Sequence, residues 1–225
     1  MARQPRLALP DLPHLVIQRG HSGQPVFTEA ADRQAYLQVL QEAARAEAVQ
    51  LHAWALLNTE VQLLLTPSTG PALGRLMQAV GRRYVSAYNR RHGRAGTLWD
   101  GRFRCALVEP GAMRLLALRW VDGDPNSQAG AQRLSSAPQR LGGPRDADLV
   151  DPPEYWQLGN TPFEREAAYR ELLTLGLPAA SAEAVRRAAL TGKVLGSAAF
   201  GRGLGGLARL RQTPRPRGRP RRAGV

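Results

Sequence analysis

The sequence predicts an α+β fold in which an antiparallel sheet packs against helices. Two short apolar runs, Ala53–Leu57 and Val61–Leu65, flank the polar turn Asn58–Glu60, which indicates two adjacent strands of a sheet centre. Segments with helical spacing of apolar residues precede and follow this hairpin. The resulting order of strand, helix, strand, strand, helix, strand, helix favours a single ferredoxin-like antiparallel sheet with its helices largely on one face.

The elements before and after the hairpin follow from local signals. Leu12–Arg19 is apolar enough for a first strand and leads into a glycine-containing turn. Thr28 is a candidate N-cap for a helix over Glu29–Ala48. Pro71 suits the first turn of a second helix over Ala72–His92, which carries apolar residues at i, i+3 and i+4.

A fourth strand over Phe103–Val108 and a third helix over Pro110–Trp120 complete the expected first domain, residues 1–125. Residues 126–153 are rich in Gly, Pro, Ser and Gln, so we expect a connector. Residues 154–210 are expected as a helical extension. Residues 211–225 contain Arg and Pro without an acid, which predicts a disordered tail.

Within the extension, Thr161–Leu175 carries a strong helix signal, because Thr161 is followed by a proline and, three residues later, by a glutamate. Ser181–Thr191 is expected as another helix that ends at Gly192, and Leu204–Leu210 as a last turn. The segment Ser181–Phe200 is compatible with a helix–turn–helix DNA-binding unit and equally with a pair of packing helices.

The charge of the chain indicates a polyanionic partner. There are 31 basic and 18 acidic residues, which give a formal net charge of +13, and Lys193 is the single lysine. Arginine has a planar fork that suits bidentate phosphate contacts and stacking on bases, so we expect nucleic acid as the partner. The alternative is a basic surface without a nucleic-acid partner.

Cys105 is the single cysteine, which excludes a disulfide and a cysteine metal cluster within the chain. No apolar run approaches the roughly 20 residues of a membrane span, and the N-terminus has no apolar signal core. We therefore expect a cytoplasmic protein with no membrane partner.

Glu60 and Gln62 alternate with Val61, so both side chains should leave the same face of the second hairpin strand. Two polar side chains on one face of a central strand mark a candidate metal or substrate site.

A second candidate site is basic and aromatic, and it runs from the second predicted helix to the fourth strand. Arginines hold phosphates, and exposed aromatic rings stack on unpaired bases. The alternative is that Tyr84 and Tyr88 belong to the core and the arginines form a solvated edge. The candidate DNA-binding residues are Arg19, Arg82, Arg83, Tyr84, Arg90, Arg91, Arg94, Trp99, Arg102 and Arg104.

Several motifs of this chain resemble those of the REP-associated tyrosine transposases, the small single-tyrosine branch of the HUH transposases. The resemblance extends over residues 5–221. The motifs are Gln18-Arg19-Gly20, His52-Ala53-Trp54, Gly81-Arg82-Arg83-Tyr84, Asn89-Arg90-Arg91-His92-Gly93-Arg94, Gly96-Thr97-Leu98-Trp99-Asp100-Gly101-Arg102-Phe103 and Leu195-Gly196-Ser197.

The resemblance implies a role in DNA transposition and recombination in a bacterium, in association with the nucleoid. It implies hairpin or single-stranded, REP-like DNA as partner and either a monomer or a homodimer.

The resemblance also implies a catalytic apparatus that this chain has lost. In such enzymes a His-hydrophobe-His strand binds a divalent metal, and a tyrosine in a Tyr-x-x-x-Asn-Pro segment attacks the DNA phosphate. The matching residues here are Glu60 and Gln62 for the histidines, Trp120 for the tyrosine and Asp124 for the asparagine. An indole forms no phosphodiester adduct, so the resemblance predicts a DNA-binding protein that is deficient in cleavage.

Two other functions stay open at this stage, and whether the chain is an enzyme is left undecided. Oxygen ligands suit Mg²⁺ or Mn²⁺, so Glu60, Gln62 and Asp124 could form a rewired metal site of an active nuclease or transposase, with Tyr84 or Tyr88 as nucleophile. A basic cleft on such a sheet would also accept structured RNA. His52, a lone histidine, is expected to be a packing or hydrogen-bonding residue.

Overall fold

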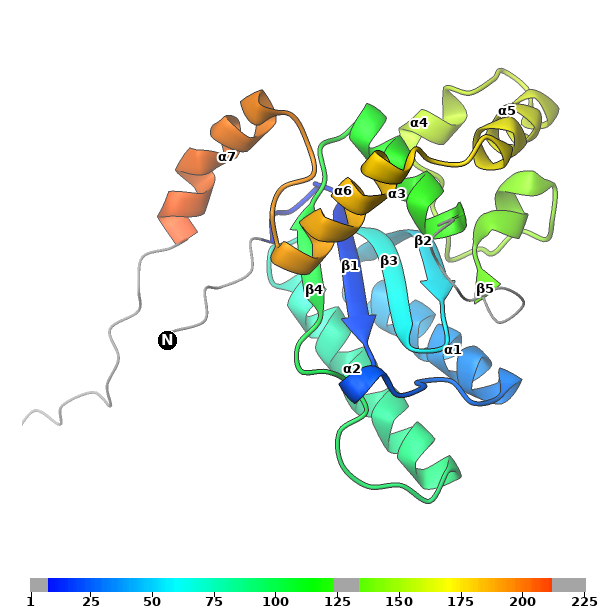
Figure 1. The fold of residues 1–225 in the computed structure, drawn as a ribbon, viewed down its shortest axis with the longest axis vertical. Helices are drawn as coiled ribbons and strands as arrows, with labels where there is room; N and C mark the ends of the chain where they lie inside the picture. Colours follow the sequence, from blue (N-terminus) through cyan, green and yellow to red (C-terminus); the bar gives the residue numbers. More distant parts are fainter. Residues whose placement is uncertain (1–7, 124–133, 212–225) are drawn as a thin grey trace, which may run out of the picture.

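The computed structural model describes residues 8–123 and 134–211. Its centre is a five-stranded sheet with the strand order β4-β1-β3-β2-β5 (Figure 1). Every strand pair in the sheet is antiparallel. The strands are β1 (His14–Arg19), β2 (Val49–Leu56), β3 (Glu60–Pro67), β4 (Arg104–Leu107) and β5 (Leu134–Ser135). The first four strands and their helices have the β-α-β-β-α-β order of a ferredoxin-like fold, so the predicted fold class is confirmed.

The central hairpin forms because β2 and β3 are apolar on both faces. Alternate residues of β3 pack into two separate cores: Leu63 and Leu65 into one, and Leu64 into the other. Every residue of β3 is buried, and Gln62 is fully so. A strand covered on both faces needs helices on both sides of the sheet.

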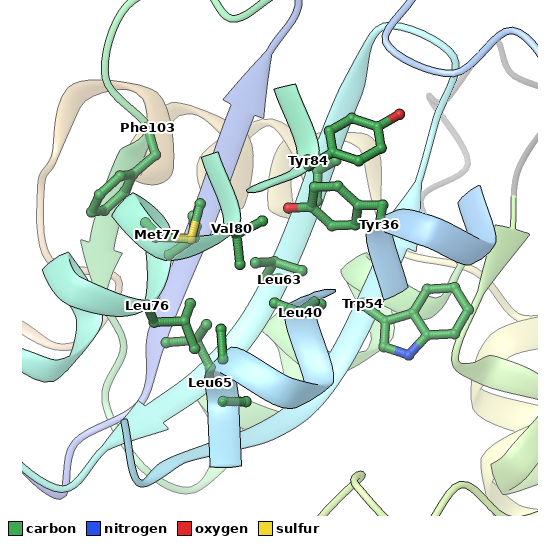
Figure 2. Close-up of a cluster of buried hydrophobic side chains, with 14 of the residues drawn as sticks. Tyr36, Leu40, Trp54, Leu63, Leu65, Leu76, Met77, Val80, Tyr84 and Phe103 are labelled. Carbon is green, nitrogen blue, oxygen red and sulfur yellow. The ribbon is translucent and has the colours of Figure 1, made fainter. Parts of the chain in front are cut away.

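One core lies between the sheet and helices α1 (Ala30–Ala46) and α2 (Ala72–Arg91). Figure 2 shows Tyr36 and Leu40 of α1 beside Leu76, Val80 and Tyr84 of α2 above the sheet. The N-cap of α1 is Glu29, in a capping box with Asp32, and not Thr28 as predicted. Asp32 also accepts bonds from the backbone and hydroxyl of Thr28, which explains why that residue resembles a cap.

The other core lies beneath α3 (Ala112–Gly123) and α6 (Ala179–Thr191), on the opposite face of the sheet (Figure 1). The expectation that the helices lie largely on one face was therefore wrong. The reason is that the C-terminal extension supplies a second layer: α6 buries Val185 and Ala189 against the face that carries Leu15 and Ile17.

The described part of the expected connector is packed onto the domain. Its β5 pairs with β2, and it continues into the 3-10 helix η3 (Ala137–Leu141), which contains the fully buried Arg140. Arg140 forms ion pairs with Asp122 of α3 and Asp151, each at 2.9 Å. The Gly, Pro, Ser and Gln content of this segment indicated a linker. Polar contacts of Arg140 hold it in place, together with the packing of Leu141 and Leu149 against the two cores.

The remaining helices follow the sequence signals more closely. They are α4 (Pro153–Trp156), α5 (Pro162–Thr174) and α7 (Ala198–Arg211), with the short η1 (His21–Gly23) after β1. Thr161 and Glu164 form the predicted capping box of α5, and Gly192 ends α6 in a left-handed conformation. α7 is longer than the single predicted turn. Residues 212–225 of the predicted disordered tail lie outside the described residues. No helix among those described is long and apolar enough to cross a membrane.

Candidate nucleic-acid interface

The candidate site begins at the end of the sheet where β3 starts and β1 finishes. Glu60 and Gln62 share one face of β3, as predicted, and the Gln62 Nε2 donates a hydrogen bond of 2.8 Å to the Glu60 Oε1. The antiparallel register places Arg19 opposite Glu60 and Ile17 opposite Gln62. This is the face of the sheet that α3 and α6 cover.

Two arginines hold the carboxylate of Glu60. Arg186 of α6 donates from both terminal nitrogens, with Nη1 and Nη2 each 3.1 Å from a carboxylate oxygen. The Nε of Arg19 donates to the Oε2 at 3.3 Å. Glu60 is therefore a buried acid with two guanidinium partners, one from β1 and one from a helix 126 residues further along the chain.

A cavity of about 470 Å³ lies beside this ion-pair cluster. Its lining combines the end of β1, the η1 turn, the β2–β3 turn, the segment before β4, and α6. The lining residues are Arg19, Gly20, Ser22, Gly23, Thr59, Glu60, Asp100 and Arg186. Two of the sequence motifs, around Arg19 and around Asp100, therefore meet at one site.

Backbone hydrogen bonds hold the motif around Arg19 and the motif around Asp100 together. The Asp100 N–H donates to the Arg19 carbonyl, and the His21 N–H donates to the Leu98 carbonyl, so the loop before β4 is fastened to the end of β1. Any side chain at Gly20 would clash, because an added Cβ would lie 2.1 Å from the carbonyl oxygen of Gln24.

A divalent metal does not fit the side chains at this site. The amide oxygen of Gln62 is buried and has no hydrogen-bond partner in the described structure, which by itself would suit a cation. The carboxylate that would bind the cation is already neutralised by Arg19 and Arg186, and two guanidinium charges oppose a second cation. Asp124, the third candidate ligand, lies outside the described residues.

Trp120 is buried in the core beneath α3 and α6, with 1% of its surface exposed. Near it in sequence, Asp122 accepts hydrogen bonds from Ser136, Arg140 and the hydroxyl of Tyr169. The end of α3 is thus fixed by buried packing and by a polar network, and no nucleophilic side chain stands at the Trp120 position.

The solved structures to which this chain is similar include transposases. A REP-associated tyrosine transposase solved in complex with a REP hairpin superposes with a TM-score of 0.45 and 12% sequence identity, over 56% of this chain and 73% of that one. A protein from Deinococcus radiodurans R1 described as a transposase gives a TM-score of 0.35 and 23% identity, over 49% of this chain and 88% of that one. No family model and no curated protein matches the chain.

Apart from Arg19, which pairs with Glu60, the predicted DNA-binding arginines divide into two groups. Arg83 pairs with Glu42, Arg91 with Asp32 and Glu29, and Arg94 donates to Gln24 and lies over the ring of Tyr88. The others are exposed and form no ion pair with any described residue. They are Arg82 and Arg90 on α2, Arg102 in the loop before β4, and Arg104 at the start of β4.

The predicted aromatic residues do not form a stacking surface. Tyr84 is buried in the first core, where its hydroxyl donates to the carbonyl of Val26, and burial raises its pKa well above 10 (Figure 2). Tyr88 and Trp99 are also buried. These rings pack against one another and are not available for stacking on bases, nor are Tyr84 and Tyr88 accessible as nucleophiles.

Two other polar clusters have structural roles. Burial lowers the pKa of His52 to about 4, although its bond to the Val150 carbonyl opposes this shift, and the Nε2 of this neutral ring accepts from Thr66. Glu29, Asp32 and His92 lie close enough to hold a metal ion. Burial acts to raise the pKa of Asp32, but bonds from His92, Thr28 and Arg91 lower it to about 2, so this carboxylate is already satisfied.

The Leu195-Gly196-Ser197 motif also has a local explanation. Leu195 bonds to β4 through its backbone, and Ser197 accepts from the Phe200 N–H at the start of α7. Gly196 leaves room for the side chain of Glu109, which accepts bonds from Ser197.

The main site residue that sequence reasoning missed is Arg186. It lies in a basic pair on a helix whose buried residues, Ala182, Val185 and Ala189, indicate which side faces the sheet. That periodicity places Arg186 beside the buried side, but the sequence contains no signal that α6 covers Glu60.

Proposed function

We propose that this protein binds hairpin or single-stranded DNA and does not cleave it. The observation that carries the proposal is the ion-pair cluster at Glu60. At the strand position where the motif resemblance expects metal ligands, a carboxylate is bound by Arg19 and Arg186. Such a cluster attracts a phosphate more readily than it attracts a cation.

Two further observations support binding without cleavage. Trp120 occupies the expected position of the nucleophilic tyrosine and is buried, and Tyr84 and Tyr88, the two candidate substitutes, are buried as well. The exposed arginines of α2 and of the start of β4 have no acidic partner in the described structure, so they are free to contact phosphates. The proposed role in DNA transposition rests on the motif resemblance.

The decisive experiment follows binding and cleavage together. A REP-type DNA hairpin, labelled at its 5′ and 3′ ends, is titrated with the protein in Mg²⁺, in Mn²⁺ and in EDTA, and each sample is assayed for nicks and for covalent protein–DNA adducts. We expect binding of similar strength in all three solutions, with neither nicks nor adducts.

The matched RNA hairpin serves as competitor in the same titration. Nicking that requires a metal and disappears in Glu60→Ala would refute the proposal in favour of a rewired nuclease. Preferential displacement by the RNA hairpin would assign the basic surface to RNA instead.

A further inference from the structure

We propose that the cavity beside Glu60 binds a phosphate group of the DNA backbone directly through Arg19 and Arg186, with no metal ion as intermediary. This inference rests on the proposed function and specifies which residues take the place of a metal.

The charges at the bottom of the cavity favour an anion. Arg19 and Arg186 share a single buried carboxylate, so the cluster carries one uncompensated positive charge. Their side chains are 40% and 32% exposed, whereas that of Glu60 is 7% exposed. A ligand entering the cavity therefore meets guanidinium groups before it meets the carboxylate.

Hydrogen-bond donors remain free around the cavity. Arg19 uses only its Nε for Glu60, so its two terminal nitrogens have no partner among the described residues. Ser22 and Thr59 are also lining residues, and their hydroxyls form no hydrogen bond within the described structure. Guanidinium and hydroxyl groups around one concave site are the donors that phosphate oxygens require.

The turn that forms one wall of the cavity is conformationally unusual. Ser22 has a φ of 51°, and Gly23 follows with a φ of 72°. A non-glycine residue in this left-handed region is disfavoured, and such residues concentrate at ligand sites where the surrounding structure fixes them. Here the bonds of the Gly20 and His21 N–H groups to the Thr59 and Leu98 carbonyls fix the turn.

Asp100 is the opposing charge. Asp100 lines the cavity but is exposed, so water and salt screen its charge more than they screen the buried cluster. It should weaken the binding of a small free anion, and Asp100→Asn should strengthen phosphate binding.

The experiment measures hairpin binding by fluorescence anisotropy in EDTA, at several salt concentrations. We expect Arg19→Gln and Arg186→Gln each to weaken binding about 5-fold and to lower the salt slope by roughly 0.7 to 0.9, the value for one phosphate contact. The matched control is Arg187→Gln, which removes the same charge from the next position of α6, where the side chain is exposed and outside the cavity.

A second arm uses inorganic phosphate alone at constant ionic strength and follows the arginine Nε–H signals by NMR. We expect shifts for Arg19 and Arg186, with Arg187 as internal reference, and larger shifts in Asp100→Asn. Circular dichroism and thermal unfolding would reveal whether Arg186→Gln detaches α6. In that case Asp100→Asn and Arg19→Gln still test the proposal.

The two arms separate this inference from the proposed function. If hairpin binding is strong but equal in wild type, Arg19→Gln and Arg186→Gln, the protein binds DNA and the phosphate site is refuted. If phosphate shifts the arginine signals but no hairpin binds, the cavity is a phosphate site and the DNA-binding function is refuted. If Arg187→Gln weakens hairpin binding as much as the two cavity variants do, the effect comes from the overall charge of the protein, and the inference is also overturned.

Discussion

Two clusters of buried acids and arginines lie on the same side of the sheet, and they differ in access to solvent. In the Asp122–Arg140–Asp151 cluster no side chain is more than 1% exposed. In the Glu60 cluster the carboxylate is buried, but both arginines reach a cavity.

The difference in exposure distinguishes a structural cluster from the cluster that we propose to bind phosphate. Arg140 donates to Asp122 and to the His52 carbonyl and pairs with Asp151, so it joins α3, β2 and the segment after η3. Arg19, by contrast, keeps its two terminal nitrogens available as hydrogen-bond donors. Buried ion pairs of the first kind are costly to disrupt, whereas half-exposed ones contribute little stability and stay available to ligands.

The largest expected effect comes from disrupting the closed cluster. Arg140→Leu leaves the carboxylates of Asp122 and Asp151 buried without their shared cation, so we expect the free energy of unfolding to fall by about 3–5 kcal/mol. Urea denaturation measures it. The control is Arg145→Gln, which removes an exposed partner of Asp151 and should cost less than about 1 kcal/mol. A loss below 1 kcal/mol for Arg140→Leu would contradict the structural role.

The second effect is a pH dependence at His52, which lies next to the closed cluster. Its folded-state pKa of about 4 is below the unfolded value of 6.5, so the unfolded chain binds the proton first as the pH falls. The contribution of His52 to the free energy of unfolding is therefore fully present above pH 6.5, and about 3 kcal/mol of it is lost as the pH falls to 4. His52→Gln should remove this part of the slope in urea titrations across that range. An unchanged slope would show that other groups cause it.

A smaller effect should follow from neutralising the acid of the open cluster. Glu60→Gln frees Arg19 and Arg186 from their shared carboxylate, so hairpin affinity should rise about 3- to 10-fold, or roughly 1 kcal/mol. Its stability loss should be smaller than that of Arg140→Leu, because the two arginines regain contact with water. Anisotropy and urea titration measure the two quantities. Weaker binding in this variant would indicate that Glu60 itself contacts the ligand.

The smallest effect compares two arginines of α2. Arg90 has no acidic partner in the described part of the chain, whereas Arg83 is paired with Glu42. Arg90→Gln should weaken hairpin binding about 2- to 3-fold and reduce its salt dependence, and Arg83→Gln should have less effect, since its charge is already compensated. The reverse order would place the DNA on a different part of α2.

The elements that the sequence predicted well are those determined by local patterns. The central hairpin, the shared face of Glu60 and Gln62, and the Thr161 capping box each depend on residues close together in the chain. The coverage of both sheet faces by helices was harder to predict. The apolar pattern of a strand indicates that its faces are buried, but it does not show which helices cover each face.

The candidate site was predicted only in part, for the same reason. The resemblance of motifs drew attention to Arg19, Glu60 and the loop that includes Asp100, and the structure brings these together. It could not supply Arg186, and it suggested exposed rings where Tyr84 and Trp99 fill the core. Contacts between residues far apart in sequence depend on packing, which no local pattern encodes.

The ion pair between Glu60 and Arg186 has a consequence for how the chain is made. A ribosome synthesises β1 to β4 and α3 before it reaches α6, so the nascent domain first exists with the part of one sheet face that α6 covers still exposed, and with Glu60 lacking its second arginine. Chains interrupted before residue 186 would expose apolar residues such as Leu15 and Ile17 and would tend to aggregate. The proposed phosphate site is therefore completed last, and only a chain translated beyond α6 can carry it.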